Sequence, residues 1–111
     1  DSAAHAFMRN ETRLQKLSAK PSEIVQRQLR VTPYPHEDAG WIVANAGDQV
    51  ALFSSDYPHV EGGRAPLKRF DDSLRGTPMA AQRRFFADNF IDLMGAGLAP
   101  HLRRPAHLAA A

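Results

Sequence analysis

A short apolar run that ends in polar residues is the feature that most constrains how this 111-residue chain can fold. Val50-Ala51-Leu52-Phe53 lacks the polar alternation of a strand with one face in water. Such a run predicts a strand buried on both faces, as in parallel sheets. It leads directly into Ser54-Ser55-Asp56-Tyr57-Pro58-His59. Polar residues at the carboxyl end of a buried strand are where open-sheet and barrel enzymes carry their chemistry, so this segment is the first candidate site.

Helical patterns alternate with the expected strands. Polar and apolar residues alternate over Gln28–Thr32, which predicts a second strand that ends at Pro33. Glu37–Ala46 predicts a helix stopped by Gly47, with Trp41, Ile42 and Ala44 or Asn45 turned inward. Further helices are expected over Ala3–Ala19, in a turn through Glu23–Arg27 with Ser22 as cap, over Leu67–Leu74 and over Met79–Met94. This order predicts an α/β fold with parallel strands.

The segment Met79–Met94 has the strongest helical pattern. Thr77 is expected as its N-cap, with Pro78 in the first turn. The apolar residues Phe86, Phe90 and Leu93 recur at intervals of four and three and predict a wide buried face. Gly95 is expected to end the helix.

Composition excludes several classes of protein. Without cysteine the chain forms no disulfide and no Cys-ligated zinc or iron–sulfur site, and this suits a cytoplasmic protein. No apolar run approaches the roughly 18 residues of a membrane span, and no secretory signal is visible. The length fits about one small domain and is far below the ~250 residues of an eight-stranded barrel.

The basic residues are mostly arginine and lie mainly in the second half of the chain. Residues 61–111 carry eight basic and five acidic groups, a net charge of +3, within an overall charge of +2. Acidic residues are interspersed with the arginines along Arg64–Asp92. This pattern favours solvated helix faces over nucleic-acid binding, which needs a concentrated basic stripe. No nucleic-acid partner and no membrane partner are therefore expected.

The candidate site and the long helix together resemble a known family. The stretch Ser54-Ser55-Asp56-Tyr57-Pro58-His59, followed by Asn89-Phe90 and Gly95, is similar to the C-terminal end of the amidohydrolase-related metal-dependent hydrolases. Within that family it most resembles the branch of aminocarboxymuconate-semialdehyde decarboxylase-like enzymes. The resemblance runs over residues 21–95, and residues 96–111 form a tail outside it.

The resemblance implies both a fold and an activity. The fold implied is the C-terminal βα units of a TIM (β/α)₈ barrel, so that residues 1–111 form one C-terminal fragment of an incomplete barrel domain. The activity implied is hydrolysis by metal-activated water, or decarboxylation, of a small carboxylate or cyclic substrate. Asp56 is implied as catalytic group and ligand of a divalent metal, usually zinc, and His59 as a substrate-binding residue. A carboxylate beside a zinc-bound water, whose pKa falls to about 7, can accept its proton.

The family's other metal ligands have no counterpart in the sequence. They come from a His-x-His-like pair and from two later histidines, on strands that this chain does not contain. His101 and His107 lie six residues apart, the wrong spacing for one helix face. His5 and His36 are not placed to substitute either. The chain alone is therefore expected to be inactive, without stoichiometric metal, and to need a missing barrel part or a second copy to cover its strand edges.

Other interpretations of the same residues stay open. Asp56 alternatively caps the loop after a buried strand, and His59 alternatively has only a structural role in that loop. The whole chain is alternatively a non-catalytic, oligomeric interaction module built from the same α/β piece. A weaker third alternative is a nucleic-acid-binding helical domain that uses the arginine-rich half. A His-x-His after an apolar strand upstream of this segment would favour the enzyme.

Overall fold

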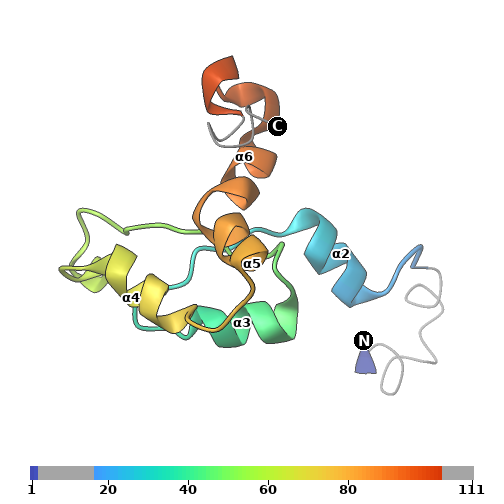
Figure 1. Ribbon diagram of the computed structural model, residues 1–111. Helices are drawn as coiled ribbons and strands as arrows, with labels where there is room; N and C mark the ends of the chain where they lie inside the picture. The colour runs from blue at the N-terminus through green and yellow to red at the C-terminus, as the bar shows by residue number, and fades with distance from the viewer. Residues whose placement is uncertain (3–16, 104–111) are drawn as a thin grey trace.

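The computed structural model describes residues 1–2 and 17–103, and helices make up most of this part of the chain (Figure 1). The α-helices are α2 (Pro21–Gln28), α3 (Ala39–Ala46), α4 (Pro66–Ser73), α5 (Met79–Arg83) and α6 (Asn89–Met94). A π-helical segment, Arg84–Asp88, joins α5 to α6. Single 3₁₀ turns lie at Val60–Gly62, Gly95–Gly97 and Pro100–Leu102. The helix expected over Ala3–Ala19 lies almost wholly outside the described residues.

The expected fold, C-terminal βα units of a TIM (β/α)₈ barrel, is wrong. Among the described residues there is no sheet, and one isolated parallel bridge joins Val31 to Ala51. Gln28, where the first strand was expected to begin, is the last residue of α2. The bridge consists of the Val31 N–H donating to the Val50 carbonyl and the Leu52 N–H donating to the Val31 carbonyl, each at 2.9 Å. The two extended segments pair with each other over only these few residues, so neither of them forms a strand.

The far edge of the 51–53 segment meets a helix instead of a strand. The Phe53 N–H donates to the Phe85 carbonyl at 2.9 Å. That carbonyl is free because Asn89 N–H bonds to the carbonyl of Arg84, five residues back, in the π-helical segment. The Asn89 side chain in turn donates to the Ala51 carbonyl at 2.8 Å. The long helix thus replaces the second neighbour that a strand in a sheet would have.

The core lies where α3, α4 and α5 meet the apolar run. Its fully buried members are Ala39, Ala51, Phe70, Leu74 and Phe85. The rings of Phe70 and Phe85 pack with centroids 5.0 Å apart. The prediction that the apolar run is buried is confirmed, since Val50, Ala51 and Leu52 are at most 5% exposed.

Helix α3 begins and ends close to where the sequence predicts. The Asp38 carboxylate accepts a hydrogen bond from the Trp41 N–H at 2.9 Å and so caps the helix. Gly47 ends it with a φ of 90°, a conformation open to glycine. The expected inward position of Trp41 is wrong, because its side chain is 64% exposed, and that of Ala44 or Asn45 is wrong because both are exposed. Ala39 and Ile42 face the core, and Trp41 lies off the stripe that they define.

The long helix runs from Met79 to Met94 but is only partly buried. The expected N-cap, Thr77, does not cap it: its hydroxyl donates to the Leu74 carbonyl, and the N-cap position is Pro78. The predicted burial of Phe90 and Leu93 is wrong, since they are 45% and 54% exposed. The reason is that α6 stands away from α2, α3 and α4 (Figure 1). Gly95 ends α6 with a φ of 48°, as predicted.

Candidate functional site

The sequence-predicted site is a tight turn after the apolar run. Backbone N–H groups of Asp56 and Tyr57 donate to the side-chain hydroxyls of Ser54 and Ser55, at 3.2 Å and 3.3 Å. The His59 N–H then donates to the Asp56 carbonyl at 2.8 Å and closes the turn. Asp56 has a φ of 55°, which a short polar side chain tolerates better than most. The local polar residues therefore fold this turn without help from a sheet.

Asp56 and His59 are brought together by the turn. The Asp56 Oδ1 lies 3.1 Å from the His59 Nδ1. The Asp56 side chain is 30% exposed and the His59 side chain is 71% exposed. In the neutral imidazole, an Nδ1–H that donates to the carboxylate leaves Nε2 as an acceptor toward solvent. The pair therefore presents one carboxylate oxygen and one imidazole nitrogen for binding or for proton transfer.

Gly62 holds the next loop against this turn. It is buried, and a Cβ at this position would clash with the Ser55 carbonyl oxygen and lie 3.3 Å from the Asp56 Cβ. Only a residue without a side chain lets the 3₁₀ turn Val60–Gly62 return so closely to Asp56. In the sequence, Gly62 stands beside Gly63 and indicates only a loop. The close approach shows that it shapes the candidate site.

The donors at this turn suit a metal but are too few to hold one. A carboxylate oxygen and an imidazole nitrogen are both ligands that zinc accepts, and catalytic zinc sites use three protein ligands. Among the described residues there is no cluster of three or more His, Asp or Glu side chains placed to hold a metal ion. His36 stacks on Tyr34, with ring centroids 5.5 Å apart, and His101 lies in the Pro100–Leu102 turn. His5 and His107 lie outside the described residues.

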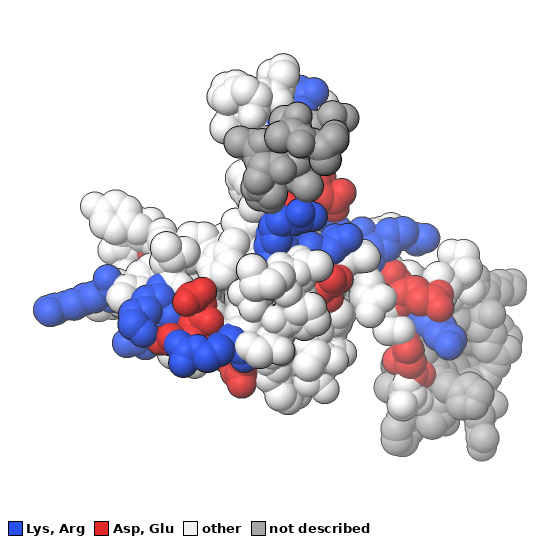
Figure 2. Space-filling model, viewed as in Figure 1, with Lys and Arg blue, Asp and Glu red and all other residues white. Residues whose placement is uncertain are grey.

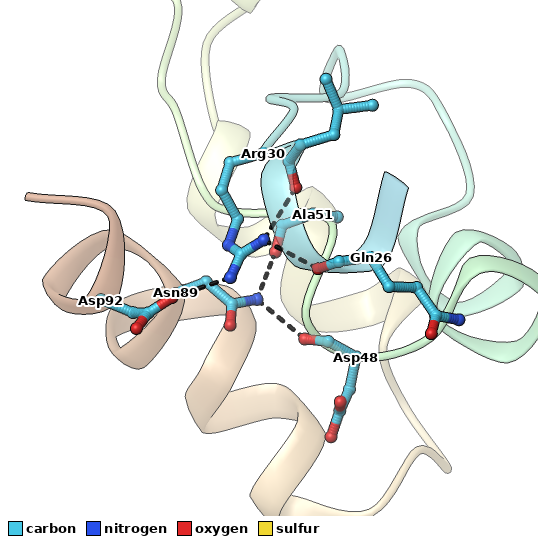
Figure 3. A network of polar contacts seen from close by, with 7 residues as sticks. Gln26, Arg30, Asp48, Ala51, Asn89 and Asp92 are labelled. Atoms are coloured by element: carbon cyan, nitrogen blue, oxygen red, sulfur yellow. Dashed lines mark hydrogen bonds and ion pairs between the residues drawn. The ribbon is translucent and has the colours of Figure 1, made fainter. Parts of the chain in front are cut away.

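A second polar cluster lies around Asn89 and Arg30, where the apolar run meets the long helix (Figure 3). Asn89 is 1% exposed, and its Nδ2 donates to the carbonyls of Asp48 and Ala51, each at 2.8 Å. Asn89 is one of the residues on which the family resemblance rests. In the structure its side chain contacts backbone carbonyls inside the fold. These contacts satisfy backbone carbonyl groups on the side of the apolar run that faces the long helix.

Arg30 belongs to the same cluster and was missed by sequence reasoning. Its guanidinium donates to the carbonyls of Gln26 and Leu29 at 3.1 Å and 2.8 Å, and to Asp92 at 2.7 Å. Its side chain is only 10% exposed, whereas that of Asp92 is 67% exposed. The sequence signal that could have identified Arg30 was its position between two apolar residues of the expected strand. Figure 3 shows Arg30 reaching across to Asp92 on α6, so this contact ties α2 to the long helix.

Most of the arginine-rich second half is paired with acids. Asp72 on α4 contacts both Lys68 and Arg75, and Arg83 contacts Asp88 at 2.7 Å. The hydrogen bond from Lys68 is the main reason that the pKa of Asp72 lies below its usual value, and the charge of Arg75 acts in the same direction. Figure 2 shows acidic and basic side chains side by side over the region of α4.

No family model, no curated protein and no solved structure matches the chain. Within residues 1–2 and 17–103, no helix combines the length and the apolar character needed to cross a membrane.

Proposed function

We propose that this chain contributes a carboxylate, Asp56, to the site of a metal-dependent hydrolase or decarboxylase of the amidohydrolase type. The observation that supports the proposal is the contact between Asp56 and His59 at the end of the buried run. The carboxylate is partly exposed, while its backbone is fixed by Ser54 and by the closing bond from His59. A fixed, partly exposed carboxylate is what a site needs from a ligand or a general base.

The proposed chemistry assigns one role to each residue of the pair. Zinc in such sites supplies a bound water whose pKa falls to about 7. The Asp56 carboxylate serves as a ligand or accepts a proton, and His59 orients that carboxylate through its Nδ1–H. The exposed Nε2 of His59, an acceptor in this tautomer, is then free to accept a hydrogen bond from a hydroxyl or N–H group of a small carboxylate or cyclic substrate. The proposal retains the cytoplasmic location expected for a chain without cysteine.

The proposal requires ligands beyond the described residues. Two donors do not make a three-ligand catalytic site, so this chain alone is expected to be inactive. The missing metal ligands must come from another polypeptide chain. The alternative, an interaction module without catalysis, requires no metal affinity at this turn.

A zinc titration followed by NMR tests the role of Asp56. We expect weak binding that shifts the signals of residues 56–59, and at least about tenfold weaker binding in Asp56→Asn, since one charged ligand is lost. Asp71→Asn is the matched control, because it removes an exposed carboxylate from α4, and it should bind zinc as the wild type does. Equal zinc affinity in the wild type and Asp56→Asn would remove the role assigned to Asp56.

Two further observations address the incomplete site and the enzyme class. Metal analysis after chelation should find less than one zinc per chain, and a full, chelator-resistant equivalent would show that the site is complete without a partner. The reading frame upstream of Asp1 should encode an apolar run followed by His-x-His. If it does not, the hydrolase proposal fails and the interaction module is the better account.

A further inference from the structure

Two adjoining hollows lie on the surface beside helices α4 and α5. Their volumes are about 420 and 510 Å³, and Asp71 and Phe86 line both of them. Each volume is within the roughly 300–1,000 Å³ of pockets that take small molecules. Neither Asp56 nor His59 lines either hollow, so this place is separate from the turn described above.

Apolar side chains form much of the lining. The ring of Phe86 is fixed by the core, because its centroid lies 5.8 Å from that of Phe53 and 5.2 Å from that of Phe85. The Phe86 side chain is only partly buried, so some of it stays open to the hollows. Leu67 and Met79, which are 59% and 76% exposed, add apolar surface from α4 and α5. A ligand ring can therefore pack on a fixed aromatic ring and contact two more adaptable side chains.

Three charged side chains also line the hollows, and two of them carry their own counter-ions. Lys68 pairs with Asp72 at 2.5 Å, and Arg83 pairs with Asp88 at 2.7 Å. The third, Asp71, forms no ion pair in the described part of the chain. The carboxylate of Asp71 is therefore the charge that a ligand in the hollows can neutralise.

The sequence of α4 places this carboxylate next to apolar surface. Leu67 and Asp71 are four residues apart in the helix, so they are neighbours on one face. Figure 2 shows charged side chains gathered over α4 and an uncharged surface next to them. A ligand that matches both features carries an apolar group and one positive charge.

We propose that the hollows between α4 and α5 bind a small aromatic amine, with its ring on Phe86 and its ammonium group beside Asp71. An aromatic carboxylate fits less well, because Lys68 and Arg83 already hold carboxylates and Asp71 would repel a further one. The inference does not depend on the proposed hydrolase function, since the turn of Asp56 and His59 takes no part in it.

An NMR titration with three probes tests the charge of the ligand. Phenethylamine, 2-phenylethanol and 3-phenylpropionate carry the same ring on a short chain and differ in charge. Phenethylamine should bind in the millimolar range and shift the signals of Leu67, Asp71 and Met79. The alcohol should bind about three- to fivefold more weakly, as expected for the loss of one exposed ion pair, and 3-phenylpropionate more weakly still. An alcohol or carboxylate that binds as tightly as the amine, or an amine that does not bind up to about 50 mM, would overturn the proposal.

Two variants separate the charged contact from the apolar one. Asp71→Asn should reduce the affinity for phenethylamine to that for 2-phenylethanol and leave the affinity for the alcohol unchanged. Met79→Gln should weaken both probes alike, and the fold should tolerate it because this side chain is 76% exposed. Glu61→Gln is the matched control: it removes an exposed carboxylate from the Val60–Gly62 turn, outside the lining, and should bind both probes as the wild type does. Unchanged affinity for the amine in Asp71→Asn would contradict the assigned ion pair, and unchanged affinity for both probes in Met79→Gln would show that they bind elsewhere.

Discussion

The side-chain amide of Asn89 donates to the Ala51 carbonyl at 2.8 Å, in the place where a neighbouring strand would otherwise donate. One helical turn earlier, the Phe85 carbonyl accepts from the Phe53 N–H at 2.9 Å. A parallel strand would offer the same pair, one donor and one acceptor. The π-helical segment makes this substitution possible, since it frees the carbonyl of Phe85 from the helix.

Replacement of Asn89 by alanine should therefore destabilise the fold strongly. The change leaves the buried carbonyl of Ala51 and the partly buried carbonyl of Asp48 without their donor, and an unsatisfied buried carbonyl costs about 1–3 kcal/mol. We expect the free energy of unfolding to fall by about 2–4 kcal/mol in urea denaturation. Asn45→Ala is the control, because Asn45 is exposed and donates to one exposed carbonyl; it should change stability by less than about 1 kcal/mol. Equal effects of the two substitutions would contradict the role assigned to Asn89.

For the apolar run, the sequence predicted burial correctly and secondary structure wrongly. Val50, Ala51 and Leu52 are buried as expected because apolar composition alone drives them inward. Whether they form a strand depends on which neighbours pair with them, and here the neighbour on one side is a helix. The π-helical segment and the role of Asn89 leave no local pattern in the sequence. Likewise, the spacing of Phe90 and Leu93 predicts a common face but cannot show what covers it.

The candidate site was predictable where it depends on local chemistry. Asp56 and His59 are three residues apart, so one turn closed by serine hydroxyls brings them together. Arg30 was not predictable, because its partner Asp92 lies 62 residues away in the chain. Gly62 was not predictable for a similar reason: its importance arises from the approach of one loop to another.

Gly62→Ala should disturb the candidate site. The added methyl group would meet the Ser55 carbonyl oxygen, so the Val60–Gly62 turn must move away from Asp56. We expect a loss of about 1–3 kcal/mol in unfolding free energy and changed NMR shifts at Asp56 and His59. Gly97→Ala serves as the control, because the nearest atom to its Cβ, the Met94 Cε, is at an ordinary 3.8 Å. Unchanged shifts at Asp56 in Gly62→Ala would show that the loop adapts without moving the site.

Asp72 should make stability depend on pH in the acid range. Its pKa is lowered from 3.8, first by the hydrogen bond from Lys68 and then by the charges of Lys68 and Arg75. A carboxyl whose pKa is lower in the folded state stabilises the fold above its unfolded pKa, and that contribution is lost as the pH falls through the folded pKa. In Lys68→Met, an NMR titration of Asp72 should show its pKa moving back up toward 3.8. In Lys20→Met, which changes a lysine outside α4, the pKa of Asp72 should stay where it is in the wild type.

Phe85 and Phe90 should respond to truncation to very different extents, although both lie on the long helix. Phe85 is fully buried, with its ring 5.0 Å from that of Phe70, so Phe85→Ala should lower the unfolding free energy by about 3–5 kcal/mol. Phe90 is 45% exposed, so Phe90→Ala should lower it by less than about 1 kcal/mol. Urea denaturation at low protein concentration measures both effects. If Phe90→Ala destabilises the chain as much as Phe85→Ala does, Phe90 contributes to the core in solution and its exposed position is contradicted.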